Sequence, residues 1–116
     1  MSDIVTLTRK KEYNRAYAKG KSFVSDLLVI YILKNRNNGI RLGITTSKKI
    51  GNAVQRNRAR RVIKESFRHI LPRLNGNFDI VFVARKKTPF VKSMYVEKQM
   101  VYGFNKLNLF GASIHK

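Results

Sequence analysis

Residues 47–68, with the sequence SKKIGNAVQRNRARRVIKESFR, constrain the fold of this chain more than any other stretch. On a wheel of about 3.6 residues per turn, the apolar and small side chains after Gly51 fall on one arc. They are Ala59, Val62, Ile63, Ser66, Phe67 and Ile70. Asn52, followed by Gln55 three residues later, is typical of a capped helix start, and Pro72 of a helix end. The stretch therefore predicts a helix that packs one face on a core.

The other face of this predicted helix is almost uniformly cationic. Eight residues of the stretch are basic and only Glu65 is acidic. Like charges four residues apart, such as Arg60 and Lys64, repel by roughly 0.2–0.5 kcal/mol per pair, and solvated helix faces usually mix the two signs. A solvated face is the plain interpretation, but a row of unrelieved positive charge favours a polyanionic partner.

The residues expected to contact such a partner carry a positive charge or an amide. They are Lys48, Lys49, Asn52, Arg56, Asn57, Arg58, Arg60, Arg61, Lys64 and Arg68. The planar guanidinium of arginine suits phosphate, because it donates two parallel hydrogen bonds. Asn57 either binds the edge of a base or braces the helix, and the pattern is compatible with both roles.

The composition of the whole chain points to nucleic acid as the partner. A chain of 116 residues with 43% hydrophobic residues is long enough for one modest core, so we expect a single domain. The formal net charge of +19 attracts polyanions over long distances. Basic residues occur along the whole chain rather than in one terminal amphipathic segment, which favours nucleic acid over a membrane surface.

Residue usage also narrows the chemistry and the compartment. The chain has no cysteine, which excludes disulfides, thiol nucleophiles and thiolate zinc sites. The first residues lack the apolar segment of a signal peptide, and the longest apolar run, 27–33, is too short to cross a membrane. We therefore expect a cytoplasmic protein.

The acidic residues and histidines do not form a recognisable catalytic set. The six carboxylates are scattered as Asp3, Glu12, Asp26, Glu65, Asp79 and Glu97. No two are spaced to share a helix or strand face, as a two-metal nuclease requires. His69 lies near a predicted helix end, and His115 lies in the C-terminal tail. Because a glycine-rich phosphate loop is also missing, the pattern favours binding over catalysis by the protein itself.

The segment before the basic helix predicts one helix and two strands. Residues 8–19 predict a short basic helix capped by Thr8. Residues 22–34 predict one long strand, because their apolar run is rich in β-branched side chains. A turn signal at 35–39 leads to a second strand at 41–46, so we expect the two strands to form an antiparallel hairpin.

The segment after the basic helix predicts a strand and a helix. Residues 78–85 place apolar side chains on both faces, which is typical of a buried strand. Ser93 is expected to cap a last helix, whose apolar stripe is expected to be core and consists of Val96, Met100, Phe104 and Leu107. The tail after Gly111 is expected to fray. Helices packed on strands in this order predict an α+β two-layer sandwich.

Two tyrosines lie four residues apart on the first predicted helix. Tyr13 and Tyr17 either pack on the core or line a groove in which unpaired bases stack, at roughly 1–3 kcal/mol per base. Arginines and lysines surround both positions in the sequence, which is compatible with the second interpretation.

Residues 47–64 resemble the protein subunit of bacterial ribonuclease P. The family pattern is Ser-Lys-Lys, a hydrophobic residue, Gly-Asn-Ala and then an arginine–asparagine–arginine core, which stands here as Arg56-Asn57-Arg58. It continues here with Arg60, Arg61 and Lys64. The resemblance extends over residues 8–108, and includes two aromatics four apart before a glycine in the first predicted helix.

Three positions depart from the family pattern. Ala59 stands where the family usually has a larger aliphatic residue, so the helix is expected to pack less deeply there. Tyr13 and Tyr17 stand where phenylalanines are common, and their hydroxyls add a hydrogen-bonding option to the stacking surface.

The resemblance implies a fold of the order α-β-β-β-α-β-α with a left-handed β-α-β crossover, like the second domain of a small-subunit ribosomal protein. It also implies a role as the protein component of an endoribonuclease that removes the 5′ leader of precursor tRNA by phosphodiester hydrolysis. Catalysis is then expected in the RNA subunit, which holds most of the Mg²⁺. The implied partners are that catalytic RNA and precursor tRNA, without a membrane or an obligate protein partner.

On this resemblance, the basic residues given above bind the catalytic RNA, and Tyr13, Tyr17 and Tyr31 bind the leader. Residues 1–116 are then one RNA-binding domain, with an ordered core at about 8–110. Three other classes share the charge: a structural RNA-binding protein without a leader groove, a protein nuclease that acts alone, and a protein that compacts duplex DNA. Each lacks the support of the motif.

Overall fold

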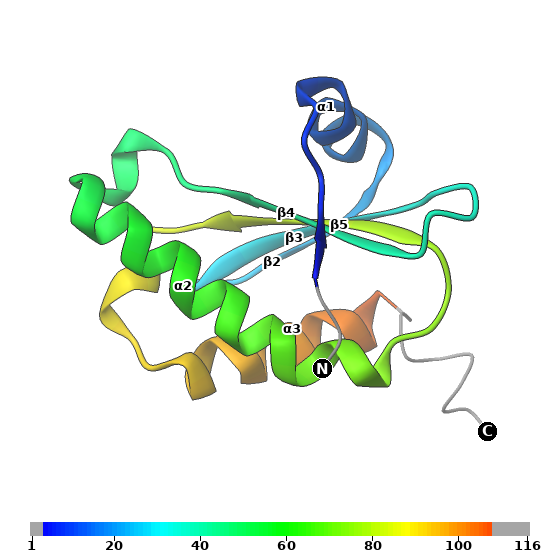
Figure 1. Ribbon diagram of the computed structural model, residues 1–116. Coiled ribbons are helices and arrows are strands. Elements are labelled where there is room, and N and C mark those ends of the chain that lie inside the picture. Colours follow the sequence, from blue (N-terminus) through cyan, green and yellow to red (C-terminus); the bar gives the residue numbers. More distant parts are fainter. Residues whose placement is uncertain (1–3, 108–116) are drawn as a thin grey trace.

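A five-stranded mixed sheet forms the centre of the molecule (Figure 1). The computed structural model describes residues 4–107, so the tail after Gly111, His115 and the expected core residues 108–110 lie outside it. The strands are β1 (Val5–Thr6), β2 (Lys21–Val24), β3 (Leu28–Lys34), β4 (Ile40–Thr45) and β5 (Phe78–Ala84). They lie in the order β1-β4-β5-β3-β2, and β5 pairs in parallel with β4 and antiparallel with β3. The outer strands add a parallel β1–β4 pair and an antiparallel β2–β3 pair.

Within residues 4–107, three α-helices cover the two faces of this sheet unequally. They are α1 (Lys10–Lys19), α2 (Ala53–Ile70) and α3 (Ser93–Lys106), and three short 3₁₀ helices accompany them as η1 (Lys48–Ile50), η2 (Leu71–Arg73) and η3 (Thr88–Phe90). Figure 1 shows α2 and α3 together on one face and α1 alone on the other. The predicted α+β class and element order are confirmed, with the short strand β1 added in front. None of the helices within residues 4–107 is long and apolar enough to span a bilayer.

The main core lies between the sheet and the pair α2 and α3. The side chains of Phe67, Phe82 and Phe104 are fully buried there, with ring centroids 5.5 to 6.5 Å apart. The arc predicted for α2 is confirmed, since its buried residues are Ala59, Ile63, Ser66, Phe67 and Ile70. The stripe predicted for α3 is also confirmed as core, because Val96, Met100 and Phe104 are fully buried and Leu107 packs against them.

Both ends of α2 follow the local sequence signals. The backbone N–H of Gln55 donates to Oδ1 of Asn52 at 2.9 Å, and the backbone N–H of Asn52 donates to Oε1 of Gln55 at 3.0 Å. This reciprocal pair satisfies two backbone donors that an uncapped helix leaves open. At the other end α2 stops at Ile70, and Pro72 lies in the following turn η2.

The long strand predicted at 22–34 is wrong, because the chain reverses in its middle. The hydroxyl of Ser25 accepts hydrogen bonds from the backbone N–H groups of Leu27 and Leu28, at 3.2 and 3.3 Å. The backbone N–H of Ser25 also donates to the carbonyl of Leu28 at 3.0 Å. These bonds close a tight turn, so β2 and β3 are two antiparallel strands and supply the extra strand that the family order implies.

The predicted hairpin between β3 and β4 is wrong for a different reason. Strand β5 lies between them and pairs with both, because its side chains are apolar on both faces and require a central position. The turn at 35–39 is present, with positive φ angles at Asn37 and Gly39, but it passes across one intervening strand.

Two predicted helix caps are also wrong. Helix α1 begins after Arg9 rather than after Thr8, and the carboxylate of Glu12 accepts the backbone N–H groups of Thr8 and Arg9 just before the helix. Helix α3 begins after Lys92, which provides no side-chain cap. Ser93 is instead the first residue of that helix, and its carbonyl accepts a 3.0 Å hydrogen bond from the hydroxyl of Ser66 on α2.

Candidate nucleic-acid interface

Helix α1 lies on the face of the sheet that α2 and α3 leave uncovered, and the surface beside it with Tyr17, Tyr31 and the hollow over Val29 and Val83 is called here the groove. Ala16 is the buried residue of α1, and it packs with Leu7 and Val81 in a small second core. The ring of Tyr13 lies directly over Gly43, where an added Cβ would come within 2.7 Å of ring atom Cε2. Glycine at this position therefore allows α1 to approach β4 closely.

The three predicted tyrosines come together, but with different roles. The rings of Tyr17 and Tyr31 meet edge to face, with centroids 5.1 Å apart and an interplanar angle of 72°. The hydroxyl of Tyr17 lies 2.7 Å from Oγ1 of Thr45, while Tyr17 remains 36% exposed. Tyr13 is half-buried, and its hydroxyl donates to the carbonyl of Leu7 at 3.4 Å. Tyr13 therefore serves mainly as packing, and Tyr17 presents its ring at the surface of the groove.

On the same sheet face as Tyr31, Val29 and Val83 line a hollow of about 640 Å³. Its floor is the cross-strand pair of Val29 and Val83, one step along the same face from Tyr31 and Val81. Its walls include Ser47, Lys49, Arg85, Lys86 and Lys87. Residues 85–87 were missed at the sequence level, although a basic run directly after a buried strand is a signal for cations at a sheet edge.

Two arginines of α2, Arg56 and Arg60, donate hydrogen bonds to their own chain. Arg56 donates to the carbonyl of Gly51 at 2.8 Å. Arg60 donates to the carbonyl of Ile44 at 3.0 Å and to the hydroxyl of Thr46 at 2.9 Å. The exposed members of the predicted set are Lys48, Lys49, Asn52, Asn57, Arg58, Arg60, Arg61, Lys64 and Arg68.

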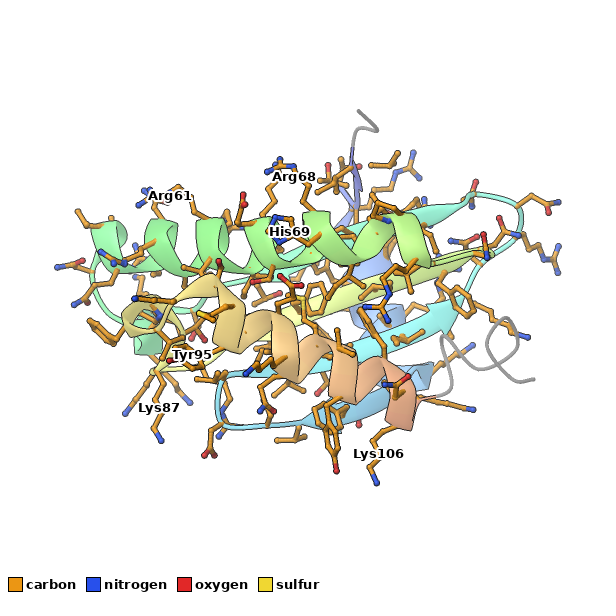
Figure 2. All side chains as sticks on the ribbon, turned by 90° about the horizontal axis from the view of Figure 1, so that it is seen from below. Arg61, Arg68, His69, Lys87, Tyr95 and Lys106 are labelled. Atoms are coloured by element: carbon orange, nitrogen blue, oxygen red, sulfur yellow. The ribbon has the colours of Figure 1, made fainter. Side chains whose placement is uncertain are left out.

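Other cations of α2 lie on its outer side. Figure 2 shows Arg61 and Arg68 projecting outward from α2. Arg68 has a 3.3 Å ion pair with Glu65. Among residues 4–107, Arg58 and Arg61 have no hydrogen bond or ion pair to another side chain or to the backbone through their guanidinium groups. Arg58 and Arg61 also line a second hollow of about 510 Å³, together with Lys92 and Met94 from the start of α3.

His69 links α2 to α3 rather than belonging to the groove (Figure 2). Its Nδ1 lies 2.9 Å from a carboxylate oxygen of Glu97 on α3, and its Nε2 lies 3.4 Å from Glu65. The hydrogen bond to Glu97 raises the pKa of His69 above the ordinary value of 6.5. The protonated ring therefore strengthens the contact between the two helices.

The described carboxylates lie beside cations. Glu12 and Asp79 both bind Arg41, and Glu65 and Glu97 both contact His69. The backbone N–H of Arg9 lowers the pKa of Glu12 below its ordinary value of 4.5, so this carboxyl is ionised at neutral pH. Within residues 4–107, no group of three or more His, Cys, Asp or Glu side chains is arranged to hold a metal ion.

The fold and this surface define a class of small, strongly basic α+β proteins with an aromatic groove on one sheet face. The family model Ribonuclease P matches residues 1–108 of the chain. The ribonuclease P protein component of Clostridium kluyveri is 44% identical over 86 residues, covering 72% of this chain and 77% of that protein. The corresponding protein of Alkaliphilus oremlandii is 34% identical over 114 residues, covering 98% of this chain and all of that protein.

Solved structures agree with the sequence comparison. The RNase P protein of Staphylococcus aureus superimposes with a TM-score of 0.80 at 27% identity, covering 94% of this chain and 100% of that one. The RNase P protein of Thermotoga maritima gives a TM-score of 0.73 at 29% identity, covering 84% and 92% of the two chains. The chain therefore belongs to the ribonuclease P protein family, which acts in tRNA processing. Membership implies a partnership with the RNA of ribonuclease P.

Proposed function

We propose that this chain binds the catalytic RNA of ribonuclease P through α2 and the 5′ leader of precursor tRNA through the groove beside α1. In this role it supports the endonucleolytic removal of the leader. The observation that carries the proposal is the placement of an aromatic groove and a cationic helix on opposite faces of one sheet. One small protein can then contact two RNA segments at the same time.

The groove has the features that single-stranded RNA requires. Unpaired bases stack on exposed aromatic rings, and Tyr17 with the adjoining Tyr31 offers such a platform. Lys49 and Arg85 line the hollow of the groove, where they can neutralise the phosphates of an extended RNA strand. An extended leader therefore has stacking partners at one end of the groove and cations at the other.

The outer side of α2 suits the folded RNA. Arg58 and Arg61 are exposed, and each guanidinium can donate two parallel hydrogen bonds to a phosphate. Lys48, Lys64 and Arg68 extend the charged surface, and Asn57 is exposed and so can reach a base edge. Arg60 contacts the RNA less directly in this account, because its guanidinium already binds the end of β4.

The chemical step belongs to the RNA subunit in this proposal, and Mg²⁺ is held mainly by that RNA. The protein contributes positive charge between two polyanions, so it lowers the Mg²⁺ concentration needed for cleavage. The proposal places the holoenzyme in the cytoplasm, with no membrane and no obligate second protein. The chain acts as a cofactor protein of an endoribonuclease.

Reconstitution tests this function. Precursor tRNA with a 5′ leader is incubated at low Mg²⁺ with a bacterial ribonuclease P RNA, with the purified protein, or with both. We expect cleavage at the mature 5′ end only when both are present, and a lower Mg²⁺ requirement than for the RNA alone. Absence of stimulation would reduce the chain to a general RNA-binding protein. Cleavage by the protein alone would assign the chemistry to the protein.

A further inference from the structure

Helix α1 has little apolar surface with which to hold its place. It is 10 residues long, and Ala16 is its only buried residue. A helix of this length is marginally stable in water unless other contacts fix it. The position of Tyr17 in the groove therefore depends on the few contacts between α1 and the sheet.

Besides the packing of Ala16 on Val81 in β5 and of Tyr17 on Tyr31 in β3, α1 has a row of contacts along β4 at alternate residues on one face of the strand. Glu12 binds Arg41, Tyr13 lies over Gly43, and the hydroxyl of Tyr17 meets Thr45. Because side chains on a strand alternate between faces, positions 41, 43 and 45 form one row beneath the helix. The contact at Arg41 holds one end of α1, and the contact at Thr45 holds the other.

Glu12 performs two tasks with one carboxylate. Its Oε1 accepts the backbone N–H groups of Thr8 and Arg9, at 3.3 and 3.1 Å, and so caps the start of α1. Its Oε2 accepts a hydrogen bond from Nη1 of Arg41 at 3.1 Å. The same guanidinium donates two further hydrogen bonds to Asp79 on β5, of 2.8 and 2.9 Å. Three elements, α1, β4 and β5, therefore meet at Arg41.

The buried end of this cluster does not need Glu12. The side chain of Asp79 is 1% exposed, and it accepts hydrogen bonds from Asn35 as well as from Arg41. Removing the charge of Glu12 therefore leaves Asp79 paired, so the large penalty of an unpaired buried charge does not arise. The loss falls on the position of α1 instead.

We propose that the cluster Glu12–Arg41–Asp79, called here the α1 clamp, sets the position of α1 along β4 and thereby shapes the groove. Glu12 is then a positioning residue for single-stranded RNA, and it acts through Tyr17. This inference rests on the proposed leader-binding function of the groove. It adds a specific residue, outside the predicted RNA contacts, on which leader binding depends.

The variant Glu12→Gln tests the α1 clamp. Glutamine keeps one oxygen, which can cap α1 or accept from Arg41 but cannot do both. Its matched control is Glu97→Gln, the same change on the opposite face of the sheet, where Glu97 binds His69. For each protein, assembled with the catalytic RNA, we measure affinity for precursor tRNA with long and with very short leaders. Affinity for the catalytic RNA and the thermal midpoint are measured in parallel.

We expect Glu12→Gln to lower the ratio of long-leader to short-leader affinity about three- to tenfold, the scale of one ordinary hydrogen bond. Glu12→Gln should not change the affinity for the catalytic RNA. Glu97→Gln should change neither this affinity nor the ratio of long-leader to short-leader affinity. In Tyr17→Ala, adding Glu12→Gln should cause little further loss, because the two residues act on the same contact. If Glu12→Gln does not fold, Glu12→Asp replaces it, since aspartate keeps the charge but shortens the reach.

Three results would overturn the inference. A folded Glu12→Gln protein with the wild-type leader ratio would show that the clamp does not shape the groove. Losses that add fully in the double variant would show that Glu12 does not act through Tyr17. If the wild-type protein binds precursor tRNA with long and with short leaders equally well, the groove does not bind the leader and this inference fails. Normal binding to the catalytic RNA in the same experiment would still support the assignment of α2.

Discussion

On one face of the sheet, α2 and α3 bury a continuous layer of large apolar side chains, whereas α1 on the other face buries only Ala16. The first face is held by the aromatic cluster of Phe67, Phe82 and Phe104. The second combines a small apolar cluster around Ala16 with polar contacts, from Glu12 to Arg41 and from Tyr17 to Thr45. One face thus uses its surface for stability, and the other leaves part of its surface open to a ligand.

This difference shows how a single small core can support an exposed binding groove. Burial of apolar area on one face contributes most of the folding free energy, at about 25 cal/mol per Å². The strands that carry this core also carry the groove, because β3 and β5 present alternate side chains to both faces. The groove therefore has a rigid floor, although α1 adds little burial of its own.

The largest effect should come from removing an aromatic ring on the core face. Phe67→Ala is expected to lower the free energy of unfolding by about 3–5 kcal/mol, because Phe67 is fully buried and its loss leaves a cavity. Urea unfolding followed by circular dichroism measures this change. A loss below about 1 kcal/mol would mean that α2 and α3 do not provide the main core.

Removing an aromatic ring on the groove face should affect leader binding more than stability. Tyr17→Ala is expected to weaken binding of a long leader by about 1–3 kcal/mol, the value of one stacked base, with a much smaller fall in thermal midpoint than Phe67→Ala causes. The matched control is Tyr102→Ala on α3, whose side chain is more exposed at 54% but lies on the core face. Equal losses of leader affinity in the two variants would contradict a specific groove.

Two neighbouring arginines on α2 should differ in their effect on salt dependence. Arg61→Gln is expected to weaken binding to the catalytic RNA, and to reduce the slope of log affinity against log salt by about 0.7–0.9, as for one lost phosphate contact. Arg60→Gln should reduce this slope less, because Arg60 is already bonded to Ile44 and Thr46. Titrations at several salt concentrations compare them, and a larger slope change for Arg60→Gln would reverse this assignment.

The smallest effect concerns pH and the link between α2 and α3. Because Glu97 raises the pKa of His69 above 6.5, the protonated ring stabilises the fold fully below about pH 6.5. This contribution is lost as the pH rises through the raised pKa of the folded state. The thermal midpoint of wild type relative to His69→Gln should therefore be higher in mildly acidic than in alkaline buffer. A difference that is independent of pH would exclude the contribution.

Local signals in the sequence predicted the local structure of α2 well. Its apolar arc, its capping pair of Asn52 and Gln55, and its end before Pro72 all involve residues within a few positions of one another. The pairing of strands could not be predicted in this way. The position of β5 between β3 and β4 depends on burial on both faces, which links segments more than 30 residues apart.

The candidate site shows the same difference between local sequence signals and long-range contacts. The sequence indicated the cations of α2 and the groove tyrosines, because both form short motifs. It gave no indication that residues 85–87 would line the same hollow as Lys49, or that Glu12 would meet Arg41. The turn at Ser25 was missed because its hydroxyl caps the reversal within an otherwise strand-like run.

The most direct test of the two-surface account is one experiment with two readouts on Tyr17→Ala and Arg61→Gln. The readouts are affinity for the catalytic RNA alone, and the ratio of affinities of the assembled complex for long-leader and short-leader precursor tRNA. We predict that Tyr17→Ala lowers only the leader ratio and that Arg61→Gln lowers only the affinity for the catalytic RNA. If both variants lower both quantities to the same extent, the two faces do not bind separate RNA segments.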